Sequence, residues 1–141
     1  GWLLIADETV RDELINWKHY TTICPPAPSE FLATAVLRHN HKFANRNRAI
    51  IRKNLAIAEA FFARWPTLFT WRPPQAGSIA LVELHQPSAT AYCDQLVADA
   101  GVMLLPSSCL GYGDGHVRMG FGRESFARDL ARYEEYLVTN R

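Results

Sequence analysis

The chain has 141 residues, of which 48% are hydrophobic and 21% charged, enough for a domain with a buried core. Its formal net charge of +1 gives no electrostatic signal for a nucleic-acid or membrane partner. No apolar run in the sequence approaches the roughly 20 residues of a membrane span, and the first residues lack the basic start of a signal peptide. The three cysteines, Cys24, Cys93 and Cys109, form no CxxC pair, so we expect them to be reduced in a cytoplasmic protein.

The first thirty residues begin with an apolar run at 2–6 that predicts a strand. Asp7 follows it and suits the N-cap of a helix that reaches about Trp17. Residues 20–29 contain three prolines, which disfavour a regular helix and stiffen the backbone. This segment is predicted to be a joint between domains or a surface against another subunit.

Two helical patterns follow the joint. Ser29 is the expected cap of the first, which begins at Glu30. The second includes residues 43–65 and ends at Pro66. His39 and His41 lie between the two patterns, but two residues apart on a helix they point in nearly opposite directions, so we expect no metal site. The cations of the second pattern are interleaved with apolar and acidic residues, which favours a solvated face over an anion-binding stripe; they are Arg46, Arg48, Arg52, Lys53 and Arg64.

The rest of the chain alternates between strand and helix patterns. Ser88 suits the N-cap of a helix, and Gly101 suits its left-handed end. Trp71 is expected to pack in a loop or short extended stretch before these elements. Pro106 closes an apolar run that we interpret as a buried strand. In order, the patterns predict a loop at 67–77, a strand at 78–84, a helix at 88–100, a strand at 102–105, a turn at 111–115, a strand at 116–121 and a helix from about 125. The prediction is an α/β fold, with a small sheet covered by helices.

One strand of this sheet carries the candidate site residue. Alternation in residues 116–121 places Val117, Met119 and Phe121 on one face, and Arg118 and Gly120 on the other. Arg118 is therefore expected to point away from the apolar layer, beside a glycine that leaves room for a ligand. Spacing alone also allows an ordinary strand arginine that pairs with a neighbouring carboxylate.

Other motifs near this strand are interpreted as structural. The glycines at 111–115 lead into a strand, whereas phosphate-binding loops lead into a helix. Ser107, Ser108 and Cys109 are possible nucleophiles, but the sequence places no histidine to activate them. Arg123 is expected in a turn before the last helix.

Residues 101–123 read GVMLLPSSCLGYGDGHVRMGFGR. This pattern resembles the C-terminal small domain of class I/II aminotransferases, the fold-type-I enzymes that depend on pyridoxal phosphate. The family usually has Pro-Gly where this chain has Pro106-Ser107. The resemblance covers essentially the whole chain, but only about the last third of such an enzyme. Other segments that agree with it in order are Gly1-Trp2-Leu3 with Ala6-Asp7-Glu8, Tyr20-Thr21-Thr22 to Pro28-Ser29-Glu30, and Ala76-Gly77-Ser78.

The resemblance implies a fold and a site. Residues 1–29 would be the end of the large cofactor-binding domain with its joint, and residues 30–141 the small C-terminal domain. Arg118 would bind the α-carboxylate of the substrate. The family holds pyridoxal phosphate on a lysine shortly before the segment that this sequence begins with, so the chain is expected to start just after that residue. Its own lysines, Lys18, Lys42 and Lys53, lie in helical patterns rich in polar neighbours.

The expected function is that of a fragment. The parent would transfer an amino group between an amino acid and a 2-oxo acid, with pyridoxal phosphate as cofactor, and would be a homodimer. The isolated chain is expected to bind no cofactor covalently and to be inactive. Two alternatives stay open: a non-catalytic, ligand-sensing or vestigial aminotransferase-like domain, and a parent that decarboxylates or eliminates. The sequence does not define the amino acid that is used.

Overall fold

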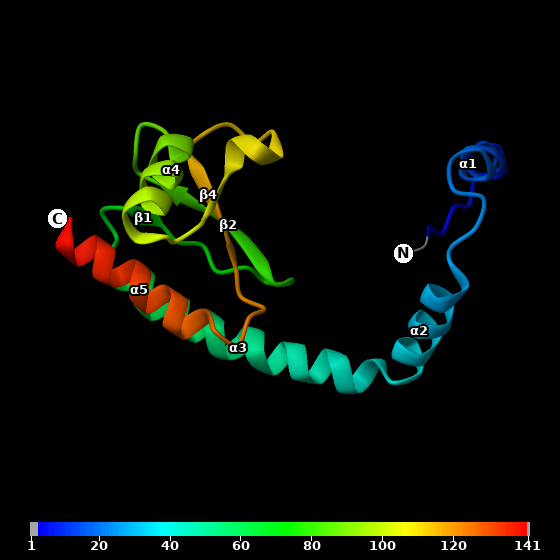
Figure 1. Ribbon diagram of the computed structural model, residues 1–141, viewed down its shortest axis with the longest axis horizontal. Coiled ribbons are helices and arrows are strands. Elements are labelled where there is room, and N and C mark those ends of the chain that lie inside the picture. Colours follow the sequence, from blue (N-terminus) through cyan, green and yellow to red (C-terminus); the bar gives the residue numbers. More distant parts are fainter. Residues whose placement is uncertain (1–2, 141) are drawn as a thin grey trace. The chain divides into compact units, whose positions relative to one another are not determined.

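The computed structural model describes residues 3–140. The chain divides into two compact units, Gly1–Phe43 and Ala44–Arg141, which Figure 1 shows in the colours of the sequence. The boundary predicted between residues 29 and 30 separates the end of the large cofactor-binding domain from the small domain. It is not a boundary between compact units, and it stays a prediction. No helix among the described residues is long and apolar enough to cross a membrane.

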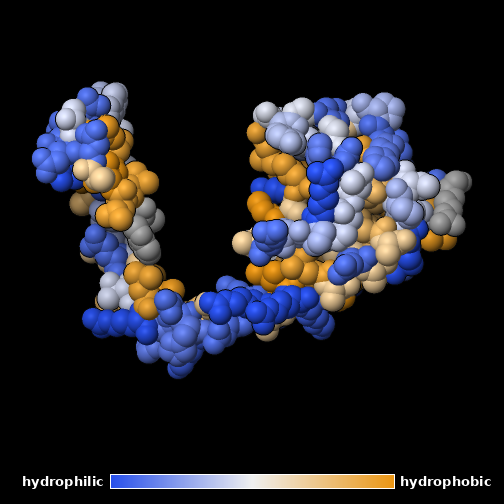
Figure 2. Space-filling model, turned by 180° about the vertical axis from the view of Figure 1, so that it is seen from behind, coloured by the Kyte–Doolittle hydropathy of each residue, from blue (hydrophilic) through white to orange (hydrophobic). Residues whose placement is uncertain are grey.

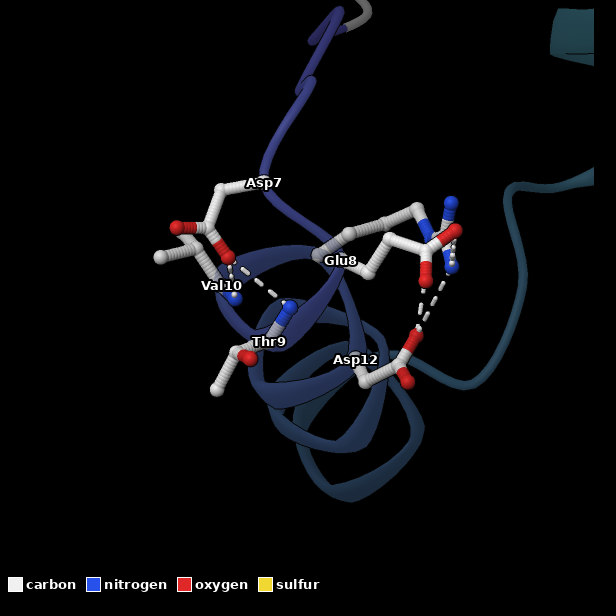
Figure 3. Close-up of polar contacts among 6 residues, drawn as sticks. Asp7, Glu8, Thr9, Val10 and Asp12 are labelled. Atoms are coloured by element: carbon white, nitrogen blue, oxygen red, sulfur yellow. Dashed lines mark hydrogen bonds and ion pairs between the residues drawn. The ribbon is translucent and has the colours of Figure 1, made fainter.

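The first unit begins with helix α1 (Glu8–Thr21). Its N-cap is Asp7, as predicted, because the Asp7 carboxylate accepts hydrogen bonds from the backbone N–H groups of Thr9 (2.9 Å) and Val10 (3.1 Å) (Figure 3). These bonds satisfy two of the N–H groups that a helix leaves unpaired at its start. The helix runs four residues beyond the predicted end at Trp17, since no glycine or proline interrupts it there.

The predicted strand at residues 2–6 is wrong for the described part of that run. Residues 3–6 are not in a strand, and Leu3 and Leu4 are exposed. A strand needs a neighbouring strand to pair its backbone groups, and residues 3–6 have no such neighbour among the described residues. Trp2 lies outside the described residues.

Helix α2 (Ala27–Arg38) begins earlier than predicted, inside the proline-rich joint. Pro26 is the N-cap, and Ser29 lies in the first turn, so the prediction of Ser29 as the cap is wrong. Proline is tolerated in a first turn because the N–H groups there have no partner within the helix. The apolar side chains of α1 and α2 are at the surface, where Figure 2 shows hydrophobic residues in orange.

Helix α3 (Asn40–Arg64) begins in the first unit and continues into the second, ending before Pro66 as the sequence predicts. The sheet has the order β1-β2-β4-β3, with every neighbouring pair antiparallel. The other elements are β1 (Phe69–Thr70), β2 (Ile79–Leu84), α4 (Ala89–Ala100), β3 (Leu105–Pro106), the 3-10 helix η1 (Ser107–Leu110), β4 (His116–Gly120) and α5 (Phe126–Thr139).

One face of this sheet carries the core. Val117 and Phe121 are fully buried, and the alternation predicted for β4 is confirmed. Trp71 packs as predicted, stacked on Phe62 with ring centroids 4.4 Å apart. The carbonyl of Arg123 accepts a hydrogen bond from Asn54, which fits its predicted structural role. Helices α3, α4 and α5 also contribute to the core, among others with Ala58, Phe61, Phe62, Cys93, Leu96, Phe126, Leu130, Tyr133 and Leu137.

The strand predicted at residues 102–105 is mostly wrong. Strand β3 has only two residues, Leu105 and Pro106, and Met103 is 84% exposed. β3 lies at the edge of the sheet and pairs only with β4. Proline is accepted in an edge strand because no neighbour needs its missing N–H. The helix before this segment is confirmed, with Ser88 as its N-cap and Gly101 left-handed at φ 60°.

Candidate functional site

On the face of the sheet opposite the core, the side chains of β2 and β4 are exposed or half-buried, and Arg118 lies on this face. The antiparallel register places Arg118 opposite Leu81 of β2 and opposite Leu105 of β3. Along β4 the alternation puts His116 and Gly120 on the same face as Arg118. The predicted direction of Arg118, away from the apolar layer, is confirmed by its exposure.

The surroundings of Arg118 are open. Within the described residues 3–140, its side chain makes no ion pair or hydrogen bond. No carboxylate in this part of the chain therefore pairs with Arg118, as the alternative of an ordinary strand arginine would require. A Cβ built at Gly120 would meet only a methyl group of Ile79 at 3.9 Å. Gly120 therefore adds free space beside the guanidinium rather than a packing contact.

A hollow of about 370 Å³ opens near Arg118, which is itself not among the residues that line it. Leu81 and His116, the cross-strand and same-face neighbours of Arg118, both line it. The remaining lining residues are Thr70, Arg72, Glu83 and Tyr112. Sequence reasoning did not identify this hollow, although alternation along residues 78–84 puts Leu81 and Glu83 on one side of their strand.

Two side chains of opposite charge line the hollow without forming an ion pair with each other. Neither Arg72 nor Glu83 forms an ion pair within the described part of the chain. Arg72 can only donate hydrogen bonds, and ionised Glu83 can only accept them. A ligand in the hollow would therefore meet one fixed donor and one fixed acceptor.

The wall at Thr70 has a defined hydrogen-bond direction. His85 Nδ1 lies 3.0 Å from the carbonyl of Thr67, which can only accept, so Nδ1 carries the proton. In the neutral ring Nε2 then accepts from the hydroxyl of Thr70, at 2.7 Å. With a neutral ring the proton of Thr70 is directed at His85, and the lone pairs of the Thr70 oxygen can accept from another donor. On another side of the hollow, the rings of Tyr112 and His116 are in edge contact, with centroids 5.3 Å apart.

The glycine-rich turn that leads into β4 is fixed to helix α4 by Asp114. Its carboxylate accepts from the hydroxyls of Ser88 and Thr90, both at 2.6 Å, and from the backbone N–H of Thr90 at 2.9 Å. The hydrogen bonds from Ser88 and then Thr90 lower the pKa of Asp114. This contact holds the strand that carries Arg118 against the start of α4.

Ser107, weighed above as a possible nucleophile, has a structural role. It is fully buried, donates to the carbonyl of Gly113 (3.0 Å) and accepts from the backbone N–H of His116 (3.2 Å). Both contacts close the turn at 111–115, where Gly111 and Gly113 have positive φ and Gly115 does not.

The chain contains three lysines. Lys18 lies on α1, and Lys42 and Lys53 lie on α3, and all three are exposed. None of them lines the hollow beside Arg118. Residues 3–140 also contain no cluster of three or more His, Cys, Asp or Glu that could hold a metal, and Cys24, Cys93 and Cys109 are free thiols.

Comparisons with known proteins identify the fold. No protein-family model matches the chain, and no curated protein matches it. Among solved structures, a PLP-dependent aminotransferase from Streptococcus suis 89-1591 is 29% identical, with a TM-score of 0.82 over 95% of this chain and 36% of that chain. The PLP-dependent cyclase OrfR is 22% identical, with a TM-score of 0.84 over 97% of this chain and 38% of its own. A tetra mutant of aspartate aminotransferase from Thermus thermophilus is 16% identical, with a TM-score of 0.75 over 90% of this chain and 36% of that chain.

The chain thus spans little more than a third of the structures that it matches. The five α-helices and the four-stranded antiparallel sheet found in residues 3–140 agree with the predicted sheet covered by helices. This chain has the fold of a segment of a PLP-dependent aminotransferase, as its resemblance in sequence predicts.

Proposed function

We propose that this chain is the C-terminal part of an aminotransferase dependent on pyridoxal phosphate, and that Arg118 binds the α-carboxylate of its amino-acid and 2-oxo-acid substrates. The observation that carries this proposal is an arginine with no carboxylate partner among residues 3–140, exposed on the open face of the sheet beside a glycine. The aminotransferase from Streptococcus suis, at 29% identity, supports the assignment.

An arginine suits this task better than a lysine. A guanidinium can donate two parallel hydrogen bonds to a carboxylate, which fixes the distance and the rotation of the bound acid, whereas an ammonium supplies charge with little orientation. Pyridoxal phosphate, when bound in the parent, supplies the electron sink that amino-group transfer requires. Arg118 would orient the substrate towards it.

The lysine that anchors the cofactor is proposed to lie outside this chain. All three lysines here are exposed on helices, and none of them lines the hollow near Arg118. The proposal therefore assigns carboxylate binding to these residues and cofactor chemistry to the rest of a parent. A homodimeric parent and a cytoplasmic location stay predictions.

Carboxylate binding can be tested on the 141-residue chain. We expect 2-oxoglutarate and L-glutamine to shift the NMR signals of the Arg118 guanidinium. Charge-assisted hydrogen bonds contribute about 1.5–3 kcal/mol, so Arg118→Ala should weaken binding by roughly 10- to 100-fold. Arg128→Ala is the matched control, because Arg128 is exposed on α5 and pairs with Asp129. Equal weakening by both variants, or none by Arg118→Ala, would overturn the assignment.

A second candidate is a ligand-sensing or vestigial domain, which the exposed lysines also support. It predicts the same carboxylate binding without group transfer. A chimera that carries this chain in place of the matching 36% of the Streptococcus suis enzyme separates the two. Amino-group transfer that depends on Arg118 supports the aminotransferase part, whereas a folded chimera that binds pyridoxal phosphate but transfers no amino group favours the sensing domain.

A further inference from the structure

We propose that the hollow beside Arg118 is a side-chain subsite for an amino acid that ends in a carboxamide, such as glutamine. This inference rests on the proposed function, since it takes Arg118 as the anchor of the α-carboxylate. It adds a substrate class, which that function leaves open, and two specificity-determining residues, Arg72 and Glu83.

The subsite is within reach of the anchor. Leu81 lies opposite Arg118 in the register, and His116 precedes it by two residues on the same face; both line the hollow. Arg72 follows strand β1, which is separated from β4 by β2 alone. Two strand spacings amount to about 10 Å, and the length of two arginine side chains shortens that gap. An amino acid with a side chain of a few carbons can therefore contact Arg118 and Arg72 together.

The two charged residues of the hollow determine which terminal group a bound amino-acid side chain can carry. A carboxylate would pair with Arg72 but would face Glu83, and a cation would pair with Glu83 but would face Arg72. Like charges at close range are costly, and discrimination often rests on such repulsion. An apolar side chain would form a hydrogen bond with neither charged group. A carboxamide offers its carbonyl oxygen to Arg72 and its NH₂ group to Glu83, so it satisfies both at once.

The other lining residues fit the same ligand. Leu81 provides an apolar surface for the methylene groups of the side chain. The hydroxyl oxygen of Thr70, which also lines the hollow, can accept a hydrogen bond from the amide NH₂. The amide therefore has a second acceptor near Glu83.

The test compares three side chains of similar length on the isotopically labelled 141-residue chain. We expect L-glutamine to bind at least fivefold more tightly than L-glutamate or L-ornithine, which corresponds to about 1 kcal/mol. Chemical shifts of the Leu81 methyl groups and of the Arg72 and Arg118 guanidinium groups report the binding. Equal affinity for the three amino acids would overturn the inference.

Charge-altering variants give a sharper result, because a purely structural role would not reverse a preference. Glu83→Gln removes the repulsion of a carboxylate, so we expect the preference to move to glutamate. Arg72→Gln removes the repulsion of a cation, so we expect it to move to ornithine. Glu59→Gln and Arg52→Gln are matched controls on exposed positions of α3, and they should leave the order unchanged.

The variant Arg118→Lys tests the subsite separately from the proposed role of Arg118 in binding the α-carboxylate. If the variant weakens the binding of all three amino acids equally and keeps the order of their affinities, the result supports both the subsite and the α-carboxylate anchor. Binding that depends on Arg118 without any glutamine preference overturns the subsite alone. A glutamine preference that is indifferent to Arg118→Lys keeps the subsite and contradicts the α-carboxylate anchor. If none of the three amino acids binds, both proposals fail.

Discussion

At the scale of single residues, Asp114 carries the clearest electrostatic signal near the site. Its carboxylate accepts three hydrogen bonds from Ser88 and Thr90, which lower its pKa in the folded chain. A group with a lowered folded pKa stabilises the fold above its ordinary pKa of about 3.9, and that contribution is lost as the pH falls through the folded value.

Asp114→Asn should therefore lower the urea midpoint of unfolding at neutral pH, and the difference from the wild type should shrink as the pH falls below about 4. Urea unfolding between neutral and acidic pH measures this. Asp94→Asn is the control, since Asp94 is exposed on the same helix. A difference between wild type and Asp114→Asn that stays constant down to pH 2 would show that the carboxylate charge contributes nothing.

The residue scale also shows what sequence alone can predict. Asp7, Ser88 and Gly101 were assigned correctly as helix caps because a cap depends on chemistry within three or four residues along the chain. The face of Arg118 was predicted for a similar reason, since alternation along a strand is local. Ser29 was misassigned because Pro26 and Pro28 are compatible with a first helical turn, and their start signal overrides the serine.

At the scale of elements, Asn54 joins helix α3 to the segment that follows β4. Asn54 is buried and donates from Nδ2 to the carbonyls of Phe121 (2.9 Å) and Arg123 (2.7 Å). Both carbonyls lie beyond the end of the strand, where no sheet partner is available to them. The orientation of β4, and with it the position of Arg118, depends on this junction.

Asn54→Ala should lower the free energy of unfolding by about 2–3 kcal/mol, because it removes a hydrogen bond from each of two carbonyls and opens a cavity. Urea denaturation of the purified variant measures the loss. Asn47→Ala on the same helix is the matched control; Asn47 is exposed, so its change should stay within about 0.5 kcal/mol. Similar losses in the two variants would mean that helix propensity, not the junction, is responsible.

Elements that depend on distant partners were harder to predict. Residues 3–6 and 102–104 are apolar enough for strands, but pairing depends on residues far away in sequence, and neither segment has a partner strand among the described residues. The hollow beside Arg118 was missed for the same reason. It requires β1, β2 and β4 to be adjacent in one register, which brings Thr70, Glu83 and His116 into line. A sequence pattern defines the face of each strand but not the order of the strands.

At the scale of the whole molecule, burial is distributed unevenly between the two units. The residues of the hydrophobic core all lie within the second unit, from Ile51 onwards. Helices α1 and α2, with 14 and 12 residues, contain no buried residue. Isolated helices shorter than about 12–15 residues are marginal in water, because most helical stability in proteins comes from packing an apolar face.

Deletion of residues 1–43 should therefore leave the unfolding of the second unit cooperative, with a free energy within about 1 kcal/mol of the full chain. In the full chain, hydrogen exchange should be fast for the amides of α1 and α2, and slow for β2, β4 and the core-facing turns of α3 and α5. Urea unfolding of the shortened chain and exchange measured on the full chain test the two halves of this prediction. Loss of cooperative unfolding on deletion, or slow exchange in α1, would show that the exposed apolar residues of the first unit, among them Trp17 and Phe31, are buried in solution and contribute to the stability of the chain.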